Sequence, residues 1–175
     1  RKAGPAKEMA AIGTRIAATD ARLASMFPEY ASLANPEPLS IADSQALLKT
    51  DEALLVIMFG DELGFVWAVT PDAVQWRTIP IGTKALAEKV QALRCGLDAS
   101  HWSSAAGRER CRQLTGADVS GGGPLPFDLA KAHELYSALL GPFENLLRGT
   151  RLLIVPSGAL TTLPFDVLVT AKPST

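Results

Sequence analysis

The sequence predicts an α/β protein, and three features of the chain lead to this fold class. Residues 152–155 form a short, unbroken apolar run that stops at Pro156, as in strands buried on both faces. Residues 52–81 hold three apolar segments separated by turn residues, which is typical of an antiparallel meander. Amphipathic segments lie between this meander and the last strand, so helices and sheet should form layers of one fold.

The composition is that of an ordinary globular chain. With 175 residues, one domain is the first expectation, and such a chain buries about 70% of its unfolded surface. The 17 basic and 18 acidic side chains nearly cancel, so no global field favours nucleic acid or an anionic membrane. No apolar run approaches the ~20 residues that span a bilayer. The chain starts at Arg1 without a signal-peptide core, and we expect a piece of a longer protein.

The N-terminal region, residues 1–37, is predicted to be a helix followed by a linker. Residues 6–27 are rich in alanine, carry a spaced apolar series from Ile12 to Phe27, and stop at Pro28. Small residues would allow a partner helix to approach, as at the end of a helical-repeat region. A terminal helix packed on its own domain is an equally weighted alternative. The two prolines of residues 35–38 indicate a stiff linker.

The globular part is predicted to cover residues 38–175. Ser40 to Asp43 resembles a capping box, and it would begin a short helix through Lys49 that buries Leu47 and Leu48. The meander follows, with a central strand at 53–59, a strand apolar on both faces at 64–70, and a wetter strand near an edge at 74–79.

Two tryptophans face each other in this predicted meander. Trp67 and Trp76 fit either a cross-strand pair in the core or a platform that stacks on a ligand. No basic stripe accompanies them, as nucleic-acid stacking would require, and this favours core packing.

The remaining helices lie between residues 83 and 147. Thr83 is the expected N-cap of a helix to Leu97 whose stripe is Leu86, Val90, Leu93 and Leu97. Residues 98–126 are polar and predict a loop with a short helix at 108–114. The triple glycine of residues 121–123 lacks the Gly-Lys-Ser/Thr of a phosphate loop, so we interpret it as a mobile loop. A long helix over 127–147 should break at Gly141-Pro142, with these residues facing the sheet: Leu129, Ala132, Leu135, Tyr136, Leu139 and Leu140.

The segment around the last strand resembles a known family. Val155 to Leu168 reads Val-Pro-x-Gly-x-Leu-x-x-Leu-Pro-Phe-x-x-Leu, with Gly158 turning the chain and Leu160, Leu163 and Phe165 as apolar anchors. This pattern is similar to the signature that opens the core of CHAT domains, which are caspase-like α/β domains often found behind tetratricopeptide repeats in bacterial proteins. The preceding helix, Leu135 to Leu147, matches the family's Leu-Tyr-x-x-Leu-(Leu)-x-Pro pattern, and the resemblance covers roughly residues 38–170.

The resemblance implies a partial caspase-like sheet. In that family the catalytic histidine and cysteine lie on later strands, so both would come downstream of Thr175 and the chain as given would be inactive. Strand 152–155 would be the buried centre of a larger sheet whose neighbours on one side are missing. We therefore expect an exposed edge there, and with it pairing with another copy or poor solubility.

Few side chains of the chain are candidates for catalysis. The nucleophiles and bases are Cys95, Cys111, His101 and His133. The two cysteines suggest no disulfide framework and suit a reducing cytosol, which predicts a cytoplasmic location. Both histidines fall on predicted loop or helix surfaces, so we expect no internal dyad.

The surroundings of Cys111 could activate its thiol, because Arg110 and Arg112 would lower the thiol pKa. Metal, cofactor and serine-nucleophile sites are not expected. No Cys-x-x-Cys or His-x-x-x-His pair indicates a metal, and no cofactor is implied. Ser157 lacks the Gly-x-Ser-x-Gly frame of a nucleophile elbow, and we interpret it as a turn residue.

Two functions follow as expectations. The first is the N-terminal portion of a CHAT caspase-like cysteine peptidase domain, completed by its missing C-terminal half. The second is a non-catalytic protein-interaction or signalling module coupled to tetratricopeptide repeats. Both imply protein or peptide partners and upstream helical repeats, without nucleic acid or membrane.

Overall fold

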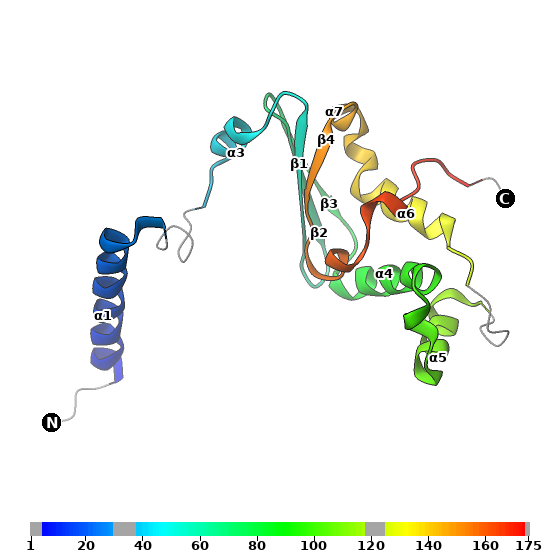
Figure 1. Cartoon of the computed structure of the whole chain (residues 1–175), viewed down its shortest axis with the longest axis horizontal. Helices are drawn as coiled ribbons and strands as arrows, with labels where there is room; N and C mark the ends of the chain where they lie inside the picture. Colours follow the sequence, from blue (N-terminus) through cyan, green and yellow to red (C-terminus); the bar gives the residue numbers. More distant parts are fainter. Residues whose placement is uncertain (1–4, 30–37, 118–124, 174–175) are drawn as a thin grey trace. The chain divides into compact units, whose positions relative to one another are not determined.

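The computed structural model describes residues 5–29, 38–117 and 125–173, which belong to two compact units that divide between Ser40 and Ile41 (Figure 1). Most of the predicted linker and the whole triple glycine lie outside the described residues. Among the described residues, no helix has the length and apolar character needed to cross a membrane.

The first unit contains helix α1, Pro5–Met26. This confirms the predicted N-terminal helix and its end before Pro28. The apolar series lies largely open within the described part of the chain, with Ile12 53% and Ile16 56% exposed.

The second unit begins with helix α3, Ile41–Leu47. Gln45 Nε2 donates a 2.9 Å hydrogen bond to the Thr70 carbonyl oxygen and fixes this short helix beside the meander. Leu47 is 71% exposed, so its predicted burial is wrong. It is the last residue of the helix, while Gln45 lies on the side that contacts the sheet.

Four strands form one mixed sheet: β1 (Glu52–Phe59), β2 (Gly64–Val69), β3 (Val74–Ile79) and β4 (Arg151–Val155). The spatial order is β3-β2-β1-β4. Strands β1, β2 and β3 pair antiparallel in chain order, and β4 pairs parallel with β1. The meander, the interior place of β1 and the edge place of β3 are confirmed.

Strand β4 lies at the other edge, so the prediction of a buried central strand at 152–155 is wrong for the described chain. Leu153 and Val155 are 41% and 51% exposed. An apolar run indicates that both faces favour apolar contacts, but it carries no information on whether a strand lies on each side.

The helices after the meander are α4 (Thr83–Leu97), the 3₁₀ turn η1 (Ala99–Trp102), α5 (Ala105–Thr115), α6 (Leu129–Leu139), η2 (Gly141–Phe143) and α7 (Glu144–Leu147). The break at Gly141-Pro142 is confirmed. Helix α5 is longer than the predicted 108–114. Helix α6 starts at 129 instead of 127, because Asp128 Oδ1 accepts the Lys131 N–H at 2.9 Å and caps it.

One residue changes role at the start of α4. The N-cap is Gly82 and not the predicted Thr83. The Thr83 hydroxyl instead donates to the Gly60 carbonyl oxygen at 2.8 Å, and so ties the helix to the β1–β2 turn.

The core lies on one side of the sheet, where α4, α6 and the segment after β4 cover β1 and β2 (Figure 1). That segment holds the 3₁₀ turns η3 (Gly158–Thr162) and η4 (Phe165–Val167). Leu160 and Leu163 are buried and Phe165 is half-buried against the core, as predicted. Gly158 has φ +56°, the left-handed conformation that favours glycine.

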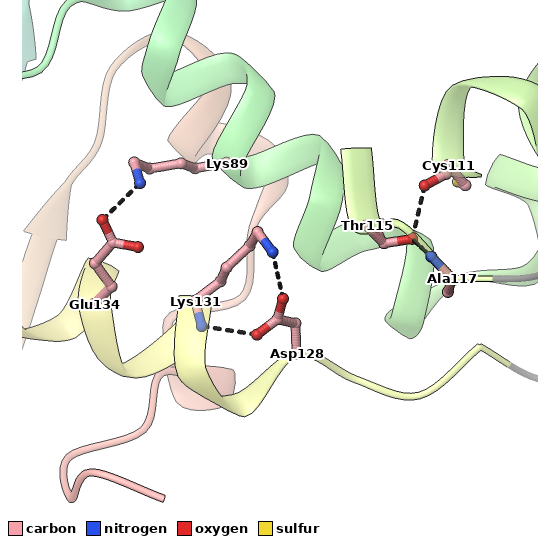
Figure 2. A network of polar contacts seen from close by, with 7 residues as sticks. All are labelled: Lys89, Cys111, Thr115, Ala117, Asp128, Lys131 and Glu134. Carbon is pink, nitrogen blue, oxygen red and sulfur yellow. Dashed lines mark hydrogen bonds and ion pairs between the residues drawn. The ribbon is translucent and has the colours of Figure 1, made fainter. Parts of the chain in front are cut away.

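Most of the predicted helix stripes are buried, including Leu86, Val90, Leu93, Ala132, Leu135 and Leu139. Leu97 and Leu129 are exceptions at 41% and 51% exposure, because each lies at a helix end beyond the sheet. Lys89 Nζ and Glu134 Oε1, 2.7 Å apart, join α4 to α6 at the surface (Figure 2).

Candidate functional site

The two cysteines form a disulfide, Cys95–Cys111, between α4 and α5. The expectation of two free cysteines is therefore wrong, and the predicted effect of Arg110 and Arg112 on a Cys111 thiol does not apply. Each cysteine is at most 2% exposed and packs with Leu125 in a small satellite core. Adjacent helices bring the two together across 16 positions of sequence, a proximity that spacing alone does not reveal.

The disulfide changes what the cysteines indicate about location. Disulfides persist mainly in oxidising compartments, so the argument from free thiols for a cytoplasmic protein is lost. The compartment stays a prediction.

The two histidines lie apart and serve local structure. His101 is in η1, where its Nε2 lies 4.0 Å from Asp98 Oδ2. His133 is on α6, and its Nδ1 lies 3.0 Å from the Val169 carbonyl oxygen. Because a carbonyl only accepts, His133 Nδ1 carries the proton and fastens the chain after η4 onto α6.

Sequence reasoning missed the neighbour of this histidine. Ser137 Oγ lies 3.4 Å from His133 Nε2 on the next turn of α6. The pair has the residue types of a nucleophile and a base at ordinary i, i+4 helix spacing. Ser137 is exposed on a helix surface, and a carbonyl takes the place of the carboxylate that would orient the base.

The other predicted positions also have structural roles. Ser157 is the residue before η3, where its carbonyl oxygen accepts from the Leu160 N–H at 3.2 Å, consistent with a turn residue. Within the described residues, no three His, Cys, Asp or Glu side chains group in a way that could hold a metal ion.

The side of the sheet opposite α4 and α6 is the first unusual surface. We call its apolar side chains the outer sheet face, namely Leu54, Val56, Met58, Phe65, Trp67, Val74, Trp76, Leu153 and Val155. Thr78, Glu52 and Arg151 lie on the same side. Five side chains of the outer sheet face are 41–55% exposed: Met58, Val74, Trp76, Leu153 and Val155. Trp67 pairs with Trp76 in the register, as predicted. Trp76 is 54% exposed, so the expected core packing is wrong for it, since α4 and α6 cover the other side of the sheet.

The backbone of β4 provides the second surface. The Arg151 N–H donates to the Asp51 carbonyl oxygen at 2.7 Å, toward β1. Because successive residues of a strand point their N–H and C=O groups to opposite sides, those of Leu152 and Ile154 point away from β1. No described strand pairs with β4 on that side. We call these groups the β4 edge.

A groove of about 520 Å³ adjoins the β4 edge on the helix-covered side of the sheet. Its apolar lining is Leu140, Leu147 and Leu152, and its polar lining includes Tyr136, Glu144 and Arg148. Burial, and then a hydrogen bond to Glu144, raise the pKa of Tyr136, so its hydroxyl stays protonated at neutral pH. Leu152 belongs to both features, because its backbone lies on the edge and its side chain lines the groove.

The start of β4 is anchored by a charged pair. Glu52 is 6% exposed, and its carboxylate accepts from the Lys49 N–H at 3.0 Å and from the Arg151 guanidinium. The Lys49 backbone bond and then the Arg151 guanidinium lower the pKa of Glu52. This pair holds the first residue of β4 beside the start of β1. The rest of the strand, residues 152–155, carries no charged side chain.

Comparison with known proteins adds no relative. No protein-family model, no curated protein and no solved structure matches the chain.

Sequence reasoning foresaw the exposed edge but not the outer sheet face or the groove. The apolar side chains on both faces of residues 64–70 indicated that the outer side of the sheet would also be apolar. They were assigned to the core because sequence does not show which side the helices cover.

Proposed function

We propose that this chain is a protein-interaction domain that accepts a β-strand along the β4 edge. The observation that carries the proposal is an unpaired strand edge between an apolar groove and an apolar outer sheet face. Exposed edges are templates for pairing, and an added strand gains main-chain hydrogen bonds while pockets select its side chains. Parallel strand pairs such as β1–β4 are ordinarily covered on both faces. The rest of the partner would therefore pack on the outer sheet face.

Amide hydrogen exchange tests this proposal directly. The probe is a blocked synthetic peptide with the sequence of residues 150–156, and the control peptide has proline in place of its isoleucine. With the chain itself diluted well below micromolar concentration, we expect the probe to slow exchange at Leu152 and Ile154, and not on β3, in a concentration-dependent way. Equal exchange with probe, control peptide and no peptide, up to about millimolar concentration, would contradict strand acceptance, because weak interactions still bind in that range.

The second candidate function is the N-terminal portion of a CHAT caspase-like cysteine peptidase domain. It is supported by the motif at 155–168 and by the position of that motif directly after a strand that pairs parallel with β1. In this candidate, the strand accepted by β4 comes from the same domain. The histidine base and the cysteine nucleophile would then lie on added strands.

The parent protein tests this candidate. A His-Gly at one strand end and a cysteine at the next, encoded beyond Thr175, are expected if it is a peptidase. Cleavage of partner proteins should then disappear when that cysteine is changed to alanine. If the parent carries neither residue, the peptidase candidate is rejected, and the strand-accepting interaction domain remains as the proposed function.

A further inference from the structure

We propose that the strand accepted at the β4 edge is supplied by a second copy of this chain, paired antiparallel about a twofold axis at Leu153. The inference rests on the proposed strand acceptance and adds the identity of the partner. Four features of the described residues lead to it: the backbone pattern of β4, its charges, the groove and the contrast with β3.

The backbone pattern of β4 is self-complementary. With the axis at Leu153, Leu152 of one copy faces Ile154 of the second copy, and Ile154 faces Leu152. Both residues point their N–H and C=O groups to the edge, so each of these two pairs exchanges two hydrogen bonds. The Leu153 residues then form the closer, non-hydrogen-bonded pair on the outer sheet face. A twofold contact of this kind closes and adds no further copies at this edge.

The charges favour this register over its neighbours. Arg151 is the charged residue of β4, and like charges placed directly opposite destabilise a strand pair. With the axis at Leu153, Arg151 lies opposite Val155 of the second copy, so the two arginines are at opposite ends of the pair. An in-register parallel arrangement would instead align them.

In this register, the groove beside the β4 edge can receive a side chain from the second copy. Residues 152 and 154 point their side chains to the helix-covered side, so Ile154 of the second copy lies beside Leu152, at the groove. The groove offers it Leu140 and Leu147 as apolar contacts. Each copy thus covers the open groove of the other.

The other sheet edge lacks these properties. Strand β3 carries the exposed Gln75 and Arg77 on the side where β1 and β2 are buried. Charged and polar residues at such positions discourage edge-to-edge pairing. Strand β4 has neither between Leu152 and Val155.

Cysteine cross-linking at the axis tests the register. In Leu153→Cys, the two new thiols occupy a non-hydrogen-bonded pair with Cα atoms about 4.5 Å apart, within the range of a disulfide. The control is Val74→Cys, because Val74 lies on the outer face of β3 and is 41% exposed, the same as Leu153. Under mild oxidation we expect Leu153→Cys to form covalent dimers at least tenfold faster than Val74→Cys.

A proline variant separates the edge from the fold. Ile154→Pro removes an N–H that points to the edge and takes no part in the β1 ladder. Introduced into Leu153→Cys, it should reduce cross-linking at least tenfold while circular dichroism stays unchanged. Leu153→Pro removes a ladder N–H and should instead disturb the fold. For the unmodified chain we expect a mass of about 37 kDa, twice the 18.5 kDa of one copy, by light scattering at micromolar concentration.

The outcomes distinguish this inference from the function on which it rests. A chain of 18.5 kDa at all concentrations, with equal cross-linking at positions 153 and 74, would overturn self-pairing. If the peptide of residues 150–156 still protected Leu152 and Ile154, the β4 edge would accept an isolated strand, and only the pairing of two whole copies would be overturned. If neither occurred, both proposals would fail.

Discussion

Glu52 is the charged side chain buried within the described residues, at 6% exposure. Its carboxylate satisfies the Lys49 N–H and the Arg151 guanidinium, and so connects the turn before β1 to the first residue of β4. A buried carboxylate is stable only with such partners. The pair therefore couples the position of the edge strand to the protonation state of one residue.

This coupling predicts an acid-sensitive contribution to stability. The pKa of Glu52 is lowered in the folded state, so the ionised form stabilises the fold above the unfolded pKa. The stabilisation is lost as pH falls through the lower folded pKa. The wild-type advantage over Glu52→Gln in free energy of unfolding should be largest near pH 7 and shrink below about pH 4.5. Urea titrations at several pH values measure it, and a constant difference from pH 7 to pH 3 would contradict it.

Gly82 is constrained by a close approach of the β1–β2 turn. A Cβ at this position would lie 1.8 Å from the Asp61 carbonyl oxygen, so backbone would have to move. We expect Gly82→Ala to destabilise the fold by about 2–3 kcal/mol, measured by chemical denaturation. The control is Gly60→Ala, whose Cβ would make an ordinary 3.6 Å contact and should cost less than about 0.5 kcal/mol. An equal loss in the free energy of unfolding for the two variants would show that the β1–β2 turn leaves room for a Cβ at position 82.

At the scale of elements, β4 is unusual because its sequence is as apolar as those of the inner strands β1 and β2 while it lies at an edge of the sheet. A substitution to aspartate separates the two properties. The buried central strand predicted from the sequence at 152–155 would make Leu153→Asp unfold the domain, because it would place an unpaired charge in the core. In the structure Leu153 is 41% exposed, so its charge stays hydrated, and we expect a cost of about 1 kcal/mol.

Leu55 provides the comparison for this substitution. It is fully buried on the neighbouring strand β1, so Leu55→Asp places an unpaired charge in the core and should cost about 4 kcal/mol or more. Thermal melting of both variants tests this expectation. Both variants are melted at a concentration too low for copies to pair, where a Leu153→Asp chain that unfolds as readily as Leu55→Asp would show that another segment of the same chain covers Leu153.

The α4–α5 hairpin depends on its disulfide. Helix α5 packs mainly on α4 and η1, around the small cluster of Cys95, Cys111 and Leu125. A cross-link closing a loop of about 15 residues contributes about 3 kcal/mol, and here the cysteines are 16 residues apart.

The disulfide should therefore act locally. In the Cys95→Ala, Cys111→Ala double variant, we expect amide exchange in α5 to rise by about 100-fold, while β1 and β2 keep their protection. The unmodified chain under reducing conditions should show the same pattern. Uniform loss of protection across the sheet would contradict a separate satellite core.

At the largest scale, within the second unit, one layer of helices covers one side of a sheet that carries apolar side chains on both sides. The outer sheet face then presents aromatic and aliphatic side chains to solvent, and large exposed patches of this kind mark interaction sites. We expect the chain to bind the dye ANS in its native state.

Paired substitutions locate the dye site. Met58→Lys with Trp76→Lys should reduce ANS fluorescence several-fold without changing circular dichroism, because both side chains are at least 54% exposed. Leu47→Lys is the control, since Leu47 is exposed but lies outside this face. A loss of equal size in the control would show that the dye binds elsewhere.

Much of the fold follows from the sequence because local periodicity records which face of an element is apolar. The helix at 83–97, the meander and the break at Gly141-Pro142 are of this kind. Leu97, Leu129 and Leu47 depart from their predicted burial because they lie at helix ends, where periodicity continues but the neighbouring layer does not. The candidate site was predictable only in part: the free edge was expected, and the groove was not.

By itself, the sequence determined the identity and approximate bounds of the strands and most helices, since these depend on residues within one or two turns of each other. The tertiary structure decided which strand is at the edge, which side of the sheet α4 and α6 cover, and that Cys95 meets Cys111. These depend on how segments far apart in the chain come together, and an apolar side chain looks the same in sequence whether its contact is inside the chain or still to be supplied by a partner.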